Sequence, residues 1–151
     1  MKLIIVKDYE EASQKACEIM LEQVKGNPNS NLGLATGSTP IRLYELMRED
    51  HKVNGTSYKN IKTFNLDEYY GLAQSHPQSY HYFMCSNLFN ELDIDMNNVH
   101  VPKGQGSIEE ECAAYNKLLD ENVVDLQLLG IGSNGHIGFN EPGTSFDSTT
   151  H

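Results

Sequence analysis

Three short segments of this chain carry residue types that could do chemistry, and each follows an apolar run. Thr36–Pro40 reads Thr-Gly-Ser-Thr-Pro, and Asn65–Tyr70 reads Asn-Leu-Asp-Glu-Tyr-Tyr. Gly130–Gly143 reads Gly-Ile-Gly-Ser-Asn-Gly-His-Ile-Gly-Phe-Asn-Glu-Pro-Gly. Short apolar runs predict buried strands, and ligands of parallel sheets bind on the loops at the carboxyl ends of the strands. The three segments are therefore the candidate functional loops.

The first segment is typical of an anion-binding loop. Gly37, Ser38 and Thr39 lie between an apolar run and Pro40, a residue that favours the first position of a helix. Free backbone N–H groups at a helix start, together with two hydroxyls, can bind a phosphate. The residues alone leave a second interpretation open, an ordinary turn that caps a helix. The Gly-x-x-x-x-Gly-Lys pattern of nucleotide-binding P-loops is absent.

The second segment places two carboxylates side by side. Asp67 and Glu68 follow an apolar run and precede Tyr69 and Tyr70. A carboxylate that is partly shielded from water can act as a general base. The alternative is a solvated acidic turn, which is the commoner setting for such a pair.

The third segment begins with a Gly-x-Gly-x-x-Gly pattern, but its context argues against dinucleotide binding. No apolar helix pattern follows, Pro142 interrupts the segment, and Asp147 is the one acid near the ribose-binding position. What remains is His136, flanked by glycines, with Glu141 five residues later. A carboxylate beside an imidazole can orient it and raise its basicity, which suits acid–base catalysis. Zinc-binding spacings such as His-Glu-x-x-His are absent, so no metal is expected.

Strands and helices alternate along the chain, and they must position these loops. Capping-box spacing at Asp8 and Ser107, and Thr39 before Pro40, predict three helix starts. Apolar residues at helical spacing predict helices over residues 12–24, after Pro40, over Tyr80–Leu92 and over residues 108–119. The predicted strands are Leu3–Val6, Leu32–Ala35, Ile61–Asn65, Asn98–Pro102 and Leu126–Ile131, the last one buried on both faces.

This alternation predicts an α/β fold, with a doubly wound, mostly parallel sheet and helices on both faces, as in Rossmann-like proteins. Residues 1–151 are expected to form one domain. No helix pattern follows the last predicted strand, so we expect the fold to be incomplete at its C-terminal end.

Composition narrows the range of partners. The 151 residues carry a net charge of −10, which argues against nucleic acid and anionic membranes as partners. No apolar stretch approaches the roughly 20 residues of a membrane helix. Three widely spaced cysteines, Cys17, Cys85 and Cys112, are expected to be free thiols. We expect a cytoplasmic protein.

Taken together, the three loops resemble the glucosamine-6-phosphate deaminase family. The segment His76–Tyr80 (His-Pro-Gln-Ser-Tyr) fits the same family, and the likeness runs in order over the whole chain. The resemblance implies an enzyme of amino-sugar (N-acetylglucosamine) catabolism. It would convert D-glucosamine 6-phosphate and water to D-fructose 6-phosphate and ammonia by ring opening and aldose–ketose isomerisation. It also implies a small sugar phosphate as the partner and no metal or organic cofactor.

The resemblance further assigns roles to individual residues. Asp67 matches the family's proton acceptor, which moves a proton from C2 to C1 of the sugar. His136 matches the residue that opens the pyranose ring, and Glu141 and Asn134 match its supporting partners. Many members carry Asp at the position of Asn134. The loop with Gly37, Ser38 and Thr39 would bind the substrate phosphate.

Family chains continue beyond the position of His151, with a mobile lid and the cationic residues of the phosphate site. The resemblance therefore implies an N-terminal portion of a longer chain. Three alternatives stay open: a non-catalytic phosphosugar-binding module, an inactive truncated remnant, and a 6-phosphogluconolactonase-like hydrolase. For the 151 residues alone we expect weak binding of the sugar phosphate and negligible turnover. We also expect self-association through the uncovered sheet, for example as a homo-oligomer.

Overall fold

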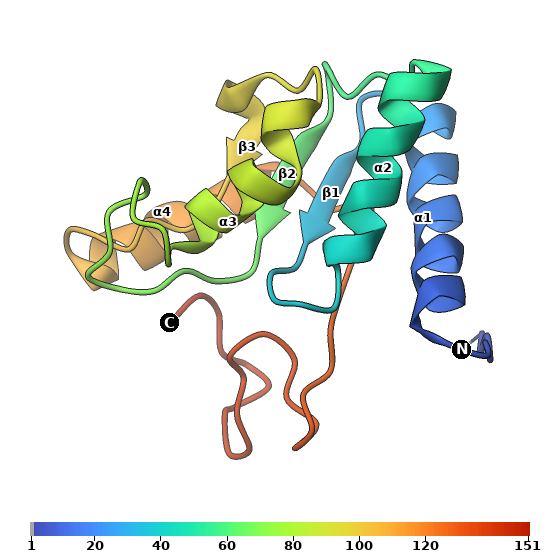
Figure 1. Ribbon diagram of the computed structural model, residues 1–151. Coiled ribbons are helices and arrows are strands. Elements are labelled where there is room, and N and C mark those ends of the chain that lie inside the picture. Colours follow the sequence, from blue (N-terminus) through green and yellow to red (C-terminus); the bar gives the residue numbers. More distant parts are fainter. Residues whose placement is uncertain (1) are drawn as a thin grey trace.

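The computed structural model describes residues 2–151 (Figure 1). Its sheet contains four parallel strands in the order β3-β2-β1-β4. The strands are β1 (Asn31–Leu34), β2 (Lys62–Asn65), β3 (Val99–His100) and β4 (Leu126–Gln127). The α-helices are α1 (Tyr9–Gly26), α2 (Ile41–Asn54), α3 (Tyr80–Asn87) and α4 (Ile108–Glu121), and two 3₁₀ turns are η1 (Phe89–Glu91) and η2 (Met96–Asn98).

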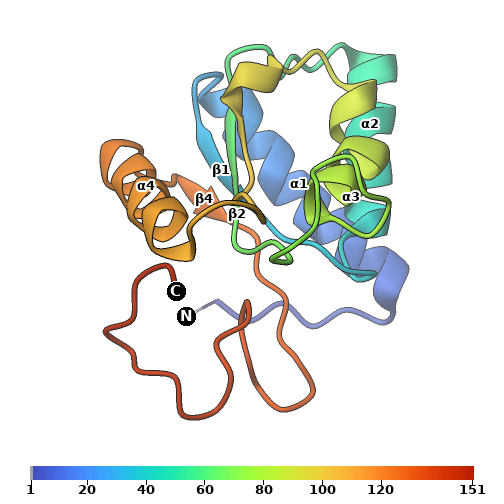
Figure 2. The same cartoon turned by 90° about the vertical axis from the view of Figure 1, so that its left-hand side faces the viewer.

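Helices cover both faces of the sheet, as the sequence predicted. Figure 2 shows α4 on one side of the strands and α1, α2 and α3 on the other. The chain adds β2 and then β3 on one side of β1, and it adds β4 on the opposite side of β1. This reversal creates a switch point between β1 and β4, where α/β sheets bind their ligands. The predicted fold class is confirmed.

The core lies between the sheet and the α1–α2 layer. Leu32 and Leu34 of β1 pack in one buried cluster with Tyr44 and Met47 of α2. The Tyr44 hydroxyl also donates a hydrogen bond of 2.5 Å to the carbonyl of Ala35. This contact fixes the end of β1 relative to α2, and with it the loop between them.

Two of the three predicted N-caps are confirmed, whereas the third helix begins one residue later than predicted and its predicted cap is wrong. Asp8 caps α1, and Ser107 caps α4. Thr39 does not cap α2, whose cap position is Pro40 without a side-chain hydrogen bond. Instead, the Tyr9 hydroxyl accepts from the Arg42 backbone N–H (3.3 Å) and donates to the Thr39 carbonyl (2.9 Å). A side chain distant in sequence therefore replaces the local cap.

The predicted strand Leu3–Val6 is also wrong, because these residues form no strand. Leu3 and Ile5 are 75% and 86% exposed. Within residues 2–151 no strand pairs with this segment. A short apolar run cannot form a strand by itself, since its stability depends on neighbours.

The strand predicted at Leu126–Ile131 is shorter and more exposed than expected. β4 ends at Gln127, and Leu129 and Ile131 are 47% and 76% exposed. In the part of the chain that the structure describes, β4 pairs with β1 alone, so its other edge is open. β4 itself is only half-buried, so the predicted burial of this strand on both faces is wrong. Similarly, the predicted strand Asn98–Pro102 contributes only the two residues of β3.

None of the described helices is both long enough and apolar enough to cross a bilayer.

Candidate active site

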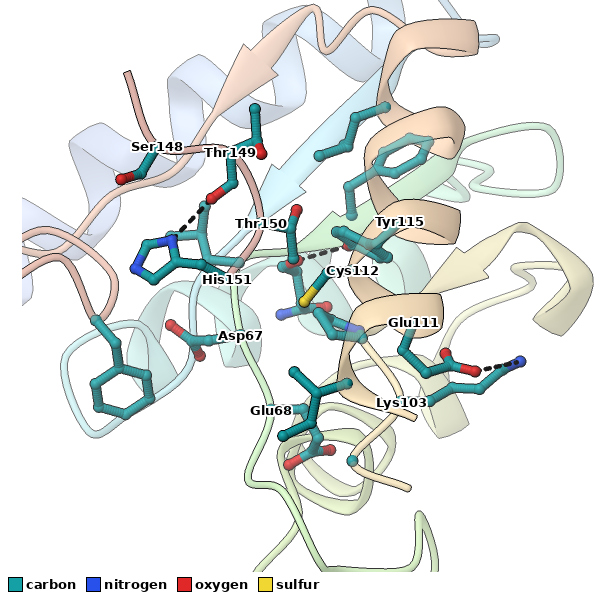
Figure 3. Close-up of a pocket in the computed structure, with 18 of the residues that line it drawn as sticks. Asp67, Glu68, Lys103, Glu111, Cys112, Tyr115, Ser148, Thr149, Thr150 and His151 are labelled. Carbon is teal, nitrogen blue, oxygen red and sulfur yellow. Dashed lines mark hydrogen bonds and ion pairs between the residues drawn. The ribbon is translucent and has the colours of Figure 1, made fainter. Parts of the chain in front are cut away.

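Asp67 lies just beyond the carboxyl end of β2, beside a cavity of about 590 Å³ (Figure 3). The cavity is bounded by the segment after β2, by α4 and by residues near the end of the chain. Figure 3 shows Asp67 on one wall and Cys112 and Tyr115 of α4 on another. Burial, together with the smaller effect of the nearby Glu68 charge, raises the pKa of Asp67 to about 6. Such a carboxylate is a stronger base than an exposed one.

Glu68 has a different role from its neighbour. Its carboxylate accepts hydrogen bonds from the backbone N–H groups of Tyr80 (2.8 Å) and His81 (2.9 Å) at the start of α3. It also accepts one from Tyr69 N–H at 2.8 Å. A negative charge at a helix N-terminus is stabilising. Glu68 therefore ties the segment after β2 to α3, and the adjacent pair is not two equivalent acids.

An aromatic cluster of Tyr69, Tyr80 and Phe139 stands next to Asp67. The Tyr69 and Tyr80 rings have centroids 4.8 Å apart, and the Tyr80 hydroxyl donates to the Tyr69 hydroxyl at 3.2 Å. Burial raises the pKa of Tyr80, and the charge of Asp67 contributes to the shift. The hydroxyl of Thr36, in the loop after β1, acts in the opposite direction. The cluster thus connects the loops that follow β1, β2 and β4.

The loop after β4 brings together the three residues singled out from its sequence. The Asn134 side-chain amide donates to one Glu141 carboxylate oxygen at 2.6 Å. Nδ1 of His136 lies 3.0 Å from the other oxygen, although the approach is too oblique to count as an aligned hydrogen bond. The His136 backbone N–H donates to Oδ1 of Asn134 at 3.2 Å. Glu141 therefore lies against the imidazole, and Asn134 holds both the Glu141 carboxylate and the His136 backbone.

Two positions of the same loop favour glycine, Gly132 because of a close approach and Gly138 because of its positive φ. A Cβ on Gly132 would lie 2.6–2.8 Å from three atoms of the His136 ring, so the ring packs directly on the Gly132 backbone. Gly138 has a φ of +60°, and a Cβ there would lie 3.8 Å from Oδ2 of Asp67. The loop therefore passes directly over the Asp67 carboxylate.

The loop after β1 has the form expected of an anion-binding loop. Gly37 has a φ of +96°, and Gly37, Ser38 and Thr39 are all exposed. Within residues 2–151 the backbone N–H groups of these three residues have no hydrogen-bond acceptor. The nearby Arg42 guanidinium points elsewhere, because Glu10, Glu45 and Glu49 bind it. The backbone N–H groups of this loop therefore supply the positive potential that could attract an anion.

The predicted site residues thus form one assembled group, one partly buried carboxylate and one separate loop. Asn134, His136 and Glu141 contact one another, and their loop covers Asp67. Thr39 lies beside a different, apolar cavity of about 210 Å³ between the ends of β1 and β4. In the described part of the chain, no three His, Cys, Asp or Glu side chains gather as metal ligands.

Sequence reasoning missed the anchoring role of Glu68 and the participation of Tyr115. The Tyr115 hydroxyl donates to the Asn65 carbonyl at 2.6 Å and fixes the end of β2. Tyr115 lies 50 residues from Asn65 in sequence, so no local pattern signals this contact.

Comparison with known proteins agrees with this arrangement. The sequence model of the family described as glucosamine-6-phosphate isomerases/6-phosphogluconolactonase matches residues 7–139. A glucosamine-6-phosphate deaminase of Geobacillus sp. (strain WCH70) is 54% identical over the whole chain. The chain spans 61% of the length of that relative.

Solved structures show the same relationship. The structure of a monomeric glucosamine-6-phosphate deaminase superposes with a TM-score of 0.97 at 45% identity, over all of this chain and 64% of its own. The 6-phosphogluconolactonase of Thermotoga maritima superposes less closely, with a TM-score of 0.74 at 25% identity, over 90% of this chain and 62% of its own. The fold, the loops and the sequence likeness lead to one conclusion: this chain belongs to the glucosamine-6-phosphate isomerase/6-phosphogluconolactonase family.

Proposed function

We propose that these 151 residues carry the acid–base groups of a glucosamine-6-phosphate deaminase. The observation that supports this most strongly is Asp67, a partly buried carboxylate with a pKa raised to about 6, beneath the loop that holds His136 against Glu141. The deaminase relatives at 54% and 45% identity point to the same activity. The remaining length of these relatives has no counterpart here, so the activity of the whole enzyme is part of the proposal.

The proposed chemistry starts with the closed sugar ring. His136, supported by Glu141, takes the proton of the anomeric hydroxyl and returns a proton to the ring oxygen. The C1–O5 bond breaks, and an aldehyde forms at C1. This step must come first, because the proton on C2 becomes acidic only beside a carbonyl.

Asp67 then performs the isomerisation. Its carboxylate takes the C2 proton while the aldehyde oxygen on C1 gains the proton that the C2 ammonium group gives up, which forms an enolamine with a C1 hydroxyl. Asp67 then returns its proton to C1. The electron pair of the broken C–H bond passes through the double bond, so C1 is reduced as C2 is oxidised to an imine. Water adds to the imine and ammonia leaves, which gives fructose 6-phosphate. At pH 7 a group with a pKa of about 6 is mostly ionised, so it is ready to act as the base.

The substrate phosphate would bind at the loop of Gly37, Ser38 and Thr39. The free N–H groups and hydroxyls of this loop suit an anion in a chain whose net charge is −10. We further propose that the protein acts in the cytoplasm on a small sugar phosphate and that it needs no metal or organic cofactor.

The lactonase alternative is less well supported. Hydrolysis of a lactone needs no base for a C2 proton, whereas the buried Asp67 suits that task. A simple phosphosugar-binding module would likewise gain nothing from a carboxylate held out of water. Neither alternative explains why the loop that pairs His136 with Glu141 also covers the partly buried Asp67.

A chimera tests the proposal. These 151 residues replace the matching segment of the Geobacillus relative, and the unmodified relative serves as the positive control. The chimera should release ammonia and fructose 6-phosphate from glucosamine 6-phosphate without added metal, and EDTA should not abolish this activity. A chimera that hydrolyses 6-phosphogluconolactone instead, or one that requires zinc after EDTA treatment, would contradict the proposal.

A further inference from the structure

Phe139 lies at the point where the loop after β4 meets the rest of the molecule. Its ring stacks on Tyr80, with centroids 6.3 Å apart and planes 13° apart. It also lies 6.2 Å from the Tyr69 ring, centroid to centroid. Tyr69 and Tyr80 belong to the segment after β2 and to α3, so one ring joins this loop to two other parts of the chain.

The rest of this loop is loosely attached. Ile131 and Ile137 are 76% and 41% exposed, and the contacts among Asn134, His136 and Glu141 are internal to the loop. Phe139 is itself 51% exposed, so its attachment consists of the ring contacts with Tyr69 and Tyr80. Gly138, the neighbour of Phe139, lies over the Asp67 carboxylate, because a Cβ built on it would be 3.8 Å from Oδ2 of Asp67. The position of the Phe139 ring therefore decides how closely Gly138 covers Asp67.

We infer that Phe139 is a positioning residue, whose ring holds the loop of His136 over Asp67 and so excludes water from that carboxylate. Phe139 contacts neither the reacting atoms nor a proton in this account. Phe139 acts through Asp67. The placement of both proposed acid–base groups, His136 and Asp67, then depends on the contact of the Phe139 ring with Tyr69 and Tyr80. The inference rests on the proposed function only where it calls Asp67 the base.

Besides burial, few groups affect the pKa of Asp67. The group that raises its pKa besides burial is Glu68, on its own segment. Tyr80 of α3 and Tyr115 of α4 face it as neutral hydroxyls, and burial raises the pKa of both. The other titratable groups around the adjoining cavity are Tyr70, Lys103, Glu111, Cys112 and His151. Since burial is the largest cause of the Asp67 shift, loss of the covering loop should lower this pKa.

NMR titration of the Asp67 carboxyl carbon in the 151-residue chain tests the inference without any need for turnover. In the unmodified chain this carboxyl should titrate near 6. Phe139→Ala should lower its pKa by more than one unit, towards the ordinary value of about 3.9. Phe139→Tyr keeps the ring and should restore the titration of the unmodified chain. Phe146→Ala, which removes a fully exposed ring beyond the loop, is the matched control and should change nothing.

A titration near 6 in folded Phe139→Ala would overturn the inference. A second measurement needs no variant: ring protons of Phe139 and Tyr80 should show nuclear Overhauser contacts in the unmodified chain, and their absence would also overturn it. Failure of the deaminase proposal looks different, because it appears as missing ammonia release by the chimera while the Phe139 effect on Asp67 persists.

Discussion

Asp67 shows how its place in the fold changes the chemistry of one side chain. It follows β2 at the edge of the sheet where the loops after β1 and β4 also emerge. Gly138 covers it, and Glu68 beside it is committed to the start of α3. An ordinary acid thereby becomes a base with a pKa of about 6. The same burial should have a cost in stability.

The first prediction concerns that cost. The native carboxyl holds its proton more tightly than the unfolded one, so stability falls as pH rises from the ordinary value of 3.8 to about 6. Asp67→Asn removes the ionisation, and above pH 6 it should stabilise the chain by about 1–3 kcal/mol, at roughly 1.4 kcal/mol per pKa unit. Below pH 4 this gain should disappear. Urea unfolding at both pH values measures it, with Asp120→Asn on exposed α4 surface as control. An equal effect of Asp67→Asn at the two pH values would contradict the burial of this group.

The second prediction concerns Gly132. A Cβ at this position would lie 2.6 Å from the His136 ring, so Gly132→Ala should push the imidazole away from Glu141. In the chimera we expect kcat to fall at least tenfold, as positioning losses of this size usually do, with little change in unfolding temperature. Gly130→Ala is the matched control, since a Cβ at Gly130 meets no atom within 4 Å. Equal activity of the two variants would show that the ring does not depend on Gly132.

At the scale of elements, the sequence predicted what depends on local pattern and missed what depends on distant partners. The alternation of strands and helices, the caps at Asp8 and Ser107 and the three loops follow from local chemistry. The cap of α2 could not be predicted, because Tyr9 supplies it from 33 residues away. The strand predicted at Leu3–Val6 failed for the related reason that pairing needs a neighbour. In the third loop, Asn134, His136 and Glu141 are close in sequence, so their convergence could be predicted.

The third prediction concerns the start of α3. Glu68→Ala removes the acceptor for the backbone N–H groups of Tyr80 and His81. The chain should lose about 1–2 kcal/mol of stability, the usual contribution of a helix cap. The pKa of Asp67 should fall as well, since the charge of Glu68 contributes to its rise. Glu22→Ala, on the exposed surface of α1, should change neither quantity. Full stability of Glu68→Ala in urea unfolding would contradict its anchoring role.

At the scale of the whole molecule, the open edge of β4 and the exposed residues that follow this strand should determine how the chain associates. β4 has one partner within the described residues, and Leu129 and Ile131 beyond it are exposed. Unpaired apolar edges favour association with a second chain. A related deaminase of known structure is described as monomeric, and this chain matches only 64% of it.

The fourth prediction is that the isolated 151-residue chain self-associates through this edge. Sedimentation velocity should show species larger than a monomer at micromolar concentrations. Ile131→Lys should shift the distribution towards the monomer, whereas Val53→Lys, at an equally exposed position at the end of α2, should not. A monomer at all concentrations would contradict the prediction.

We also expect this chain alone to bind the sugar phosphate weakly, because the helix dipole at the Gly37–Thr39 loop contributes only about 0.3–1 kcal/mol.

The most direct test of the central claim follows the C2 hydrogen. Glucosamine 6-phosphate labelled with deuterium at C2 is incubated with the chimera, and NMR follows the label. The unmodified chimera and its Asp120→Asn control should remove deuterium from C2, to C1 or to solvent, and release ammonia. Asp67→Asn should bind the substrate but leave the deuterium at C2, because an amide cannot accept the proton. Removal of deuterium by Asp67→Asn at the rate of the unmodified chimera would show that another group is the base.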